Sequence, residues 1–138
     1  MWDSREEGLR WLAQAEHDLS VAQLTLEAGY FSHCCFLCQQ AAEKAVKAIA
    51  YALGERIVLG HSVSDLCKRY AARVAEFEPL IPRAGGLDLY YVPTRYPNGL
   101  PGGVPHSVFT ERQATEAIDS AGRFLSLARV RFGGPRRQ

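Results

Sequence analysis

The sequence has no long apolar run, little lysine and almost no net charge, and each absence excludes a class of protein. None of its apolar stretches approaches the ~18 residues that a membrane-spanning helix needs, so we expect no membrane association. Lysine occurs only at positions 44, 47 and 68, and the formal net charge of the 138 residues is +1. That balance excludes strong overall attraction to nucleic acids or anionic membranes but leaves room for a local basic patch.

Several sequence signals of export and catalysis are also missing. The first seven residues are too acidic for a secretory signal, so we expect a cytoplasmic protein. No paired carboxylates and no Ser-His-Asp arrangement are evident. The glycines from Gly99 to Gly103 lack a following Gly-Lys-Ser/Thr, which excludes a phosphate-binding loop of the Walker type.

Four cysteines are present, and three of them fall within five residues: Cys34, Cys35, Cys38 and, apart from them, Cys67. Neighbours on one helix do not form a disulfide framework. A structural zinc site usually needs a second pair of ligands at a distance, and only one cysteine is available there. We therefore expect buried, reduced thiols and no metal.

The spacing of apolar residues predicts a single all-α domain over residues 1–138. Steps of three and four residues indicate helices over 4–28, 31–53, about 62–76 and about 83–92, and a last helix that Thr110-x-x-Gln113 caps. Four prolines and three glycines fill the stretch 93–109, which we expect to be a long loop without helix. The prediction is an antiparallel bundle of about five helices, with a frayed tail over 133–138.

The segment 31–53 combines two apolar stripes with one narrow polar stripe. The apolar stripes place this helix in the middle of the bundle. The polar stripe consists of His33, Gln40, Lys44, Lys47 and Tyr51, with Phe36 and Glu43 at its edges. One interpretation is a solvated face in which Glu43 pairs with Lys47. The other is an anion site, with lysines for phosphate and aromatic rings for a base.

A second group of candidate residues opens the long loop, in the segment Tyr90-Tyr91-Val92-Pro93-Thr94-Arg95-Tyr96-Pro97-Asn98. In one interpretation the tyrosine rings and the arginine only attach the loop to the bundle. In the other, Arg95 binds phosphate and Tyr96 offers a stacking surface. The pattern alone supports both equally.

Taken together, these segments resemble the HEPN domain family (higher eukaryotes and prokaryotes nucleotide-binding). The resemblance covers about residues 2–131. It rests on Trp11-x-x-x-Ala15-x-x-Asp18-Leu19, on the string from Cys35 to Ala48, on His61-Ser62-Val63-x-x-Leu66 and on Tyr91-x-x-x-Arg95-Tyr96-Pro97. The branch looks like the small standalone prokaryotic proteins and the C-terminal HEPN domain of sacsin.

The resemblance implies a helical homodimer of the cytosol. Prokaryotic members are often partners of small nucleotidyltransferases in toxin–antitoxin or defence systems, and sacsin-like members are associated with nucleotide binding. Other members are metal-independent ribonucleases that carry Arg-x(4–6)-His at a dimer cleft. In those enzymes the histidine handles a proton and the arginine stabilises phosphate charge.

This sequence departs from the ribonuclease motif where the family has it. Ten residues separate Arg95 from the next histidine, His106. Arg56 and His61, like Arg10 and His17, have a suitable spacing, but they lie elsewhere in the chain. We therefore lean against enzymatic activity, and keep His61 and His106 as candidates for a catalytic histidine.

The resulting hypothesis is a nucleotide-binding and dimerisation module, possible partner of a small nucleotidyltransferase. ATP or GTP is the expected ligand, and no cofactor is required. The expected binding residues are Gln40, Lys44, Lys47, Arg95 and Tyr96. The alternatives are a protein-interaction module without a ligand, and a metal-independent ribonuclease acting on RNA.

We also predict a homodimer, because the two apolar stripes of segment 31–53 and the rings of Trp2, Trp11 and Phe31 exceed what one small bundle easily covers. Light scattering at micromolar concentration should give about twice the 15.3 kDa of one chain. A mass near 15.3 kDa would contradict the dimer and every binding cleft shared between two copies.

Overall fold

The computed structural model describes residues 2–134, and within that range it contains only helices, turns and loops. Its order confirms an all-α fold: α1 (Ser4–Ala28), α2 (Phe31–Ala52), α3 (Val63–Tyr70), the 3-10 helix η1 (Ala75–Leu80), α4 (Ile81–Asp88), the 3-10 helix η2 (Pro97–Gly99), α5 (Pro105–Val108) and α6 (Glu111–Arg131). None of these helices is long and apolar enough to cross a membrane.

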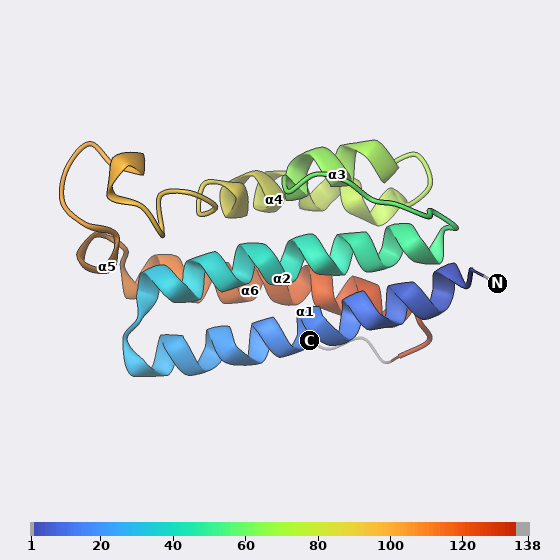
Figure 1. Ribbon diagram of the computed structural model, residues 1–138, viewed down its shortest axis with the longest axis horizontal. Coiled ribbons are helices and arrows are strands. Elements are labelled where there is room, and N and C mark those ends of the chain that lie inside the picture. Colours follow the sequence, from blue (N-terminus) through green and yellow to red (C-terminus); the bar gives the residue numbers. More distant parts are fainter. Residues whose placement is uncertain (1, 135–138) are drawn as a thin grey trace.

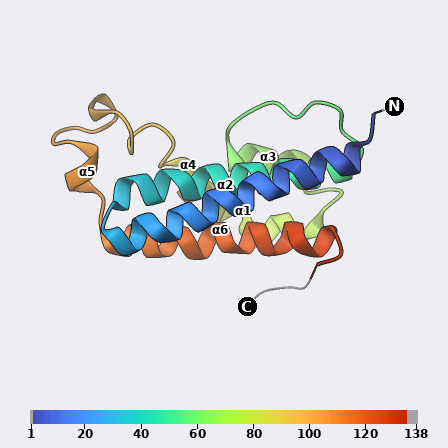
Figure 2. The same cartoon turned by 60° about the horizontal axis from the view of Figure 1, so that its bottom comes forward.

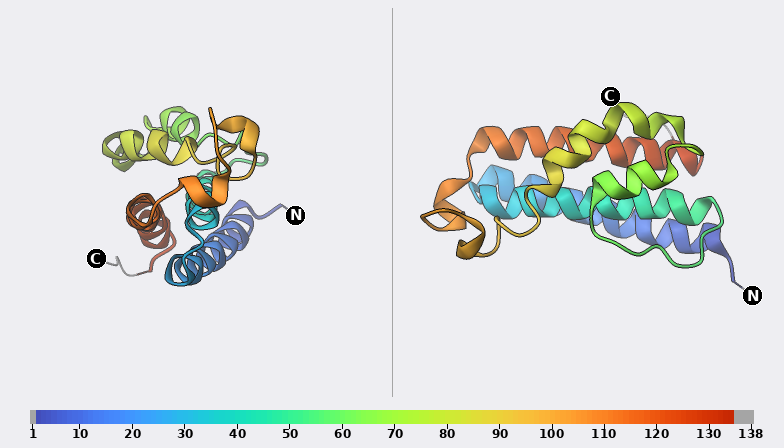
Figure 3. Two further views of the ribbon diagram at one scale, coloured as in Figure 1. Left: turned by 90° about the vertical axis from the view of Figure 1, so that its left-hand side faces the viewer. Right: turned by 90° about the horizontal axis from the view of Figure 1, so that it is seen from above.

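Three long helices, α1, α2 and α6, lie side by side and form the body of the molecule (Figures 1 and 2). α1 runs antiparallel to the other two. The segment from α3 to α4 packs on α2, on the side away from α1 (Figure 1). Seen along the bundle, α2 therefore lies in the middle of the other helices (Figure 3, left).

The first helix begins and ends where the sequence predicts. The carboxylate of Asp3 accepts the N–H of Glu6 at 3.1 Å and caps the helix. Gly29 closes the helix with a φ of 85°, in the left-handed region that favours glycine. The buried face contains the predicted stripe residues Leu12, Ala15, Leu19 and Ala22.

The central helix α2 is buried on most of its circumference, and its buried residues include nearly all of both apolar stripes. α1 and α6 make its most extensive contacts, and α3, α4 and α5 pack on it as well. The ring of Trp11 stacks on Tyr51 at 5.8 Å, and Trp2 lies 6.3 Å from the same ring. The chain thus covers most of these surfaces, while Trp2 stays 41% exposed and Trp11 and Phe31 are only partly buried. The homodimer stays a prediction.

The region between α2 and the long loop differs most from the sequence prediction. α3 ends at Tyr70, not near residue 76, because the chain turns there and continues as the 3-10 helix η1, which contains Pro79. α4 spans Ile81–Asp88, not 83–92. It starts before the predicted residue because Pro82 occupies its first turn, where a proline costs no hydrogen bond.

The proline-rich stretch 93–109 was predicted to contain no helix, and this was also wrong. It holds the short helices η2 and α5, which begin at Pro97 and Pro105 respectively. Both prolines stand at the first helical position, where their fixed φ suits a helix and the missing N–H is not needed. The rest of the stretch is loop, at the end of the bundle where α1 turns into α2 (Figure 1).

α6 confirms the predicted capping box. The N–H of Gln113 donates to the hydroxyl of Thr110 at 3.2 Å, and the side-chain oxygen of Gln113 accepts the N–H of Thr110 at 2.9 Å. The helix ends at Arg131, and Gly133 follows with a φ of 84°. Of the predicted frayed tail, residues 135–138 lie outside the described residues.

Asp88, the last residue of α4, ties three elements together. Its carboxylate accepts the backbone N–H groups of Val63 and Ser64 at 2.8 and 3.0 Å, at the start of α3. It also accepts the hydroxyl of Ser62 at 2.8 Å and the amide of Gln39 on α2 at 3.3 Å. One side chain thus satisfies the free donors at the beginning of α3 and fixes both α3 and α4 on α2.

Replacing Asp88 by alanine should lower the free energy of unfolding by about 2 to 4 kcal/mol, because several donors lose a charged acceptor at once. Urea unfolding followed by circular dichroism measures the change. Asp65→Ala is the matched control, since Asp65 is an exposed acid in the first turn of α3, the helix whose start Asp88 caps. Equal, small losses in the two variants would contradict this role of Asp88.

Candidate functional site

The polar stripe of α2 is less open than a solvated face. Lys47 and Tyr51 are buried, Gln40 and Lys44 are half-buried, and only His33 is exposed. The loop after α2 and the residues after α4 lie over this side of the helix, through contacts described below. The stripe is therefore mostly covered by other parts of the chain, and each buried polar group in it needs a partner.

Lys47 and Glu43 form the ion pair that their spacing predicts, but inside the protein. The ammonium lies 3.1 Å from Oε2 of Glu43, and the two side chains are 6% and 5% exposed. Lys47 also lies over the ring of Trp11, 5.4 Å from its centroid. The other carboxylate oxygen, Oε1 of Glu43, is buried without a hydrogen-bond partner among residues 2–134. Glu43 therefore has spare acceptor capacity.

Lys44 is neutralised in a similar way by α1. Its ammonium donates to Oδ2 of Asp18, and Gln14 donates to the other oxygen of that carboxylate at 2.9 Å. Asp18 is itself buried, beside the apolar stripe of α1. Both lysines that the sequence suggests for phosphate binding thus already have a carboxylate partner.

His61 connects the loop after α2 with Glu43. Its Nδ1 lies 3.3 Å from Oε2 of Glu43, although 64% of its side chain is exposed. Its backbone carbonyl accepts the amide of Gln39 at 2.8 Å. The imidazole stacks on the ring of Tyr91, with 5.5 Å between centroids and 16° between planes.

Arg95 lies in a group of aromatic rings at the surface. Its guanidinium is 4.4 Å from the ring centroid of Phe36, 4.8 Å from that of Tyr91 and 5.2 Å from that of Tyr96. Its Nε donates to the carbonyl of Tyr91 at 2.8 Å. No carboxylate among the described residues pairs with Arg95, so its charge faces solvent uncompensated.

The buried hydroxyl of Thr94 donates to the carbonyl of Tyr90, and the N–H of Arg95 donates to the carbonyl of Val92 at 3.0 Å. These bonds fold the backbone into a turn. Both interpretations of the segment thus have support, because the turn attaches the loop to the bundle and also presents Arg95.

The structure brings most of the predicted site residues to one side of α2. Gln40 donates to the side chain of Gln39 at 2.8 Å. It lies one turn along α2 from Phe36, whose ring lies under the guanidinium of Arg95. His106 is apart from this group: it lies exposed on α5 and forms no hydrogen bond, ion pair or ring contact within residues 2–134. Arg56 lies over the ring of Trp2, not beside His61.

Two important partners were not assigned a role from the sequence. Asp18 neutralises Lys44, and the sequence signal for it was its place in the motif Trp11-x-x-x-Ala15-x-x-Asp18-Leu19. Tyr91 lies between His61 and Arg95; its motif with Arg95 was visible, but its contact with His61 joins two separate loops and has no local signal.

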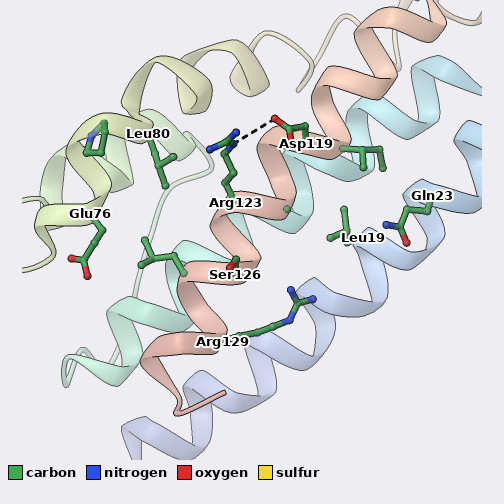
Figure 4. A pocket seen from close by; sticks show the side chains of 12 residues that line it. Leu19, Gln23, Glu76, Leu80, Asp119, Arg123, Ser126 and Arg129 are labelled. Atoms are coloured by element: carbon green, nitrogen blue, oxygen red, sulfur yellow. Dashed lines mark hydrogen bonds and ion pairs between the residues drawn. The ribbon is translucent and has the colours of Figure 1, made fainter. Parts of the chain in front are cut away.

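A groove on another face, between α1, α6 and η1, has a volume of about 780 Å³ (Figure 4). Leu19, Leu80 and Leu127 contribute apolar lining. Its arginines are paired, Arg123 with Asp119 at 3.4 Å and Arg129 with Glu16 at 3.1 Å. The groove therefore offers a phosphate no unpaired arginine from its lining.

The four cysteines are buried and free, as expected. Burial raises the pKa of Cys35 and of Cys67 to about 12, with smaller contributions from Cys34 and Asp88 respectively. These two thiols are therefore neutral at pH 7 and poor nucleophiles. Within residues 2–134, no three His, Cys, Asp or Glu side chains are grouped so as to hold a metal ion.

Comparison with known proteins identifies the class. The family model of the HEPN domain matches residues 9–131, and the chain belongs to the HEPN domain family. The resemblance inferred from the sequence is thereby confirmed.

Individual relatives agree with this assignment. A Methanocaldococcus jannaschii protein named "Putative toxin MJ1304" is 29% identical over 126 residues, which cover 85% of this chain and 82% of that protein. The crystal structure of TT1696 from Thermus thermophilus is similar with a TM-score of 0.85 and 39% identity, over 90% of this chain and 97% of that one. The crystal structure of ST0689, described as an archaeal HEPN homologue, has a TM-score of 0.73 and 36% identity, over 94% and 98% of the two chains.

Replacing Lys47 by methionine should lower the free energy of unfolding by about 3 kcal/mol, because the carboxylate of Glu43 would stay buried without its ammonium partner. Lys44→Met is the matched control. It should cost about 1 kcal/mol or less, since Lys44 is 23% exposed and Asp18 keeps the bond from Gln14. Urea unfolding at about pH 7.5 measures both, and a loss for Lys47→Met no larger than the control would contradict the buried pair.

Proposed function

We propose that this HEPN domain binds a nucleotide, with Arg95 on the phosphates and Tyr96 stacking on the base. The observation that carries the proposal is the setting of Arg95: three aromatic rings surround its guanidinium, and no carboxylate of the described residues neutralises it. A planar guanidinium binds phosphate through two parallel hydrogen bonds, and an aromatic neighbour offers a surface for a base. Tyr96 is 51% exposed and so accessible for stacking.

The remaining predicted residues take different parts in this proposal. Gln40 is half-buried at the edge of the Arg95 cluster, with its carbonyl oxygen available to a ligand donor. The ion pairs of Lys44 and Lys47 disfavour direct phosphate contacts by these lysines, whose part as ligands stays a prediction. The spare oxygen of buried Glu43 supports a functional role for this side of α2, since unsatisfied buried acceptors are rare in proteins.

The biological setting that we propose is a toxin–antitoxin or defence system. The M. jannaschii relative is named a putative toxin, which supports the toxin side of such a pair. The family resemblance adds a small nucleotidyltransferase as the partner protein and a homodimer as the working unit. In the alternative, the domain is an interaction module without a ligand.

A metal-independent ribonuclease is the second candidate, and one observation favours it. His61 is held by Glu43 with most of its ring exposed, and both His61 and Arg95 contact the ring of Tyr91. A histidine for proton transfer and an arginine for phosphate charge thus lie on the same surface. Loss of RNA cleavage in a His61→Ala variant would promote this candidate.

Isothermal titration calorimetry with ATP and GTP tests nucleotide binding. Wild type should bind at least one of them, and Arg95→Ala should weaken that binding at least tenfold. Arg95→Lys should also weaken it, because a point charge does not replace a two-pronged fork. The fold should survive both changes, since Arg95 is exposed.

Arg5→Ala is the matched control for this experiment. Arg5 is another exposed arginine over an aromatic ring, Phe132, and it donates to a backbone carbonyl, but it lies in the first turn of α1. Its replacement should leave binding unchanged. Absence of heat and of a thermal shift with both nucleotides would overturn the proposed function, and intact binding in both Arg95 variants would overturn the assignment to Arg95.

A further inference from the structure

A continuous set of contacts leads from the buried side of α2 to the guanidinium of Arg95. Glu43 holds the ring of His61 by a contact of 3.3 Å, and that ring stacks on Tyr91. The ring of Tyr91 lies 4.8 Å from the guanidinium of Arg95, and its carbonyl accepts Nε of Arg95 at 2.8 Å. Every member except Glu43 lies on a loop, and Glu43 connects the set to α2, together with Gln39 at the His61 carbonyl and Phe36 under Arg95.

We propose that Glu43 is a positioning residue for Arg95, acting through His61 and Tyr91. The proposal rests on the proposed function, because it concerns the same phosphate site. Glu43 itself does not touch the ligand in this account.

Glu43 is suited to this task because it cannot easily move. It is 4% exposed and is fixed by Lys47 on the next turn of α2. His61 is held to the same helix at a second point, since its carbonyl accepts the amide of Gln39. The orientation of the imidazole, and with it the position of Tyr91, therefore follows α2.

The charged groups around His61 are Glu43 and Lys47 from α2, Asp88 from α4 by way of Gln39, and Arg95 across Tyr91. Lys47 and His61 both contact Oε2 of Glu43, so the ion pair fixes the oxygen that the imidazole contacts.

A rival account has His61 contact the phosphate directly, and Glu43→Gln separates the two by sign. Removing a negative charge beside the site makes it more positive, so the rival account expects tighter binding of ATP or GTP. The positioning account expects binding at least fivefold weaker. Should Glu43→Gln fail to fold because Lys47 loses its partner, the double variant Glu43→Gln/Lys47→Met replaces it. This double variant leaves the local net charge unchanged, so the rival account expects unchanged binding and the positioning account still expects weaker binding.

His61→Phe is the second variant, and its fold is safe because His61 is mostly exposed. Phenylalanine keeps a ring for Tyr91 but loses the contact with Glu43. Calorimetry with ATP or GTP should show weaker binding than in wild type. Unchanged binding in His61→Phe would overturn the positioning role.

A measurement without ligand keeps this inference separate from the proposed function. The NMR signal of the Arg95 Nε–H, which donates to the Tyr91 carbonyl, should move in Glu43→Gln and in His61→Phe relative to wild type, because Tyr91 loses its fixed position. The Nε–H of Arg129, which is bound to Glu16, is the control and should not respond. If wild type binds no nucleotide, the proposed function fails alone. If the Arg95 signal ignores His61, the positioning role fails.

Discussion

The burial of α2 on nearly every side is the constraint on which the rest of the structure depends. Fifteen of its twenty-two residues are buried, and these include Gln39, Glu43 and Lys47. A buried polar group without a partner costs more than most single contacts contribute, so each of these side chains needs a partner, on α2 itself or on a neighbouring element. The irregular parts of the chain are placed by these pairings. Gln39 fixes the loop at His61 and the end of α4, and Glu43 fixes the His61 ring.

The same constraint determines which charges are left for a ligand. The chain has a net charge of only +1, and its two lysines on α2 are neutralised by Asp18 and Glu43. Arg95 differs because aromatic rings, not carboxylates, hold it in place. A protein with almost no net charge can thus present one unpaired cation beside aromatic rings. A nucleotide needs this combination, a cation for its phosphates and a stacking surface for its base.

The long helices could be predicted from the sequence because their signals are local. The cap at Asp3, the glycine at position 29 and the capping box of Thr110 and Gln113 each lie within one turn of the boundary they set. The boundaries of α3 and α4 could not be predicted in the same way. Asp88 caps α3 from twenty-five residues away, and the position of that carboxylate exists only in the folded chain.

For the candidate residues, the sequence could predict a shared side of one helix but not their burial or their partners. Periodicity placed Gln40, Lys44 and Lys47 on one side of a helix, and the structure agrees. Their exposure depends on which loops cross that side of the helix, and the periodicity of the sequence carries no information about this. The pairing of Lys44 with Asp18 and the contact of Tyr91 with His61 join elements distant in sequence, so a helical projection of residues 31–53 could not reveal them.

The central claim, that a nucleotide binds at Arg95, is tested most directly by NMR of the isotope-labelled protein during titration with ATP or GTP. We predict that the largest shifts fall on the side-chain signal of Arg95 and on the backbone of Tyr91, Tyr96 and Gln40. Largest shifts at the groove between α1, α6 and η1, or no shifts with either nucleotide, would contradict it.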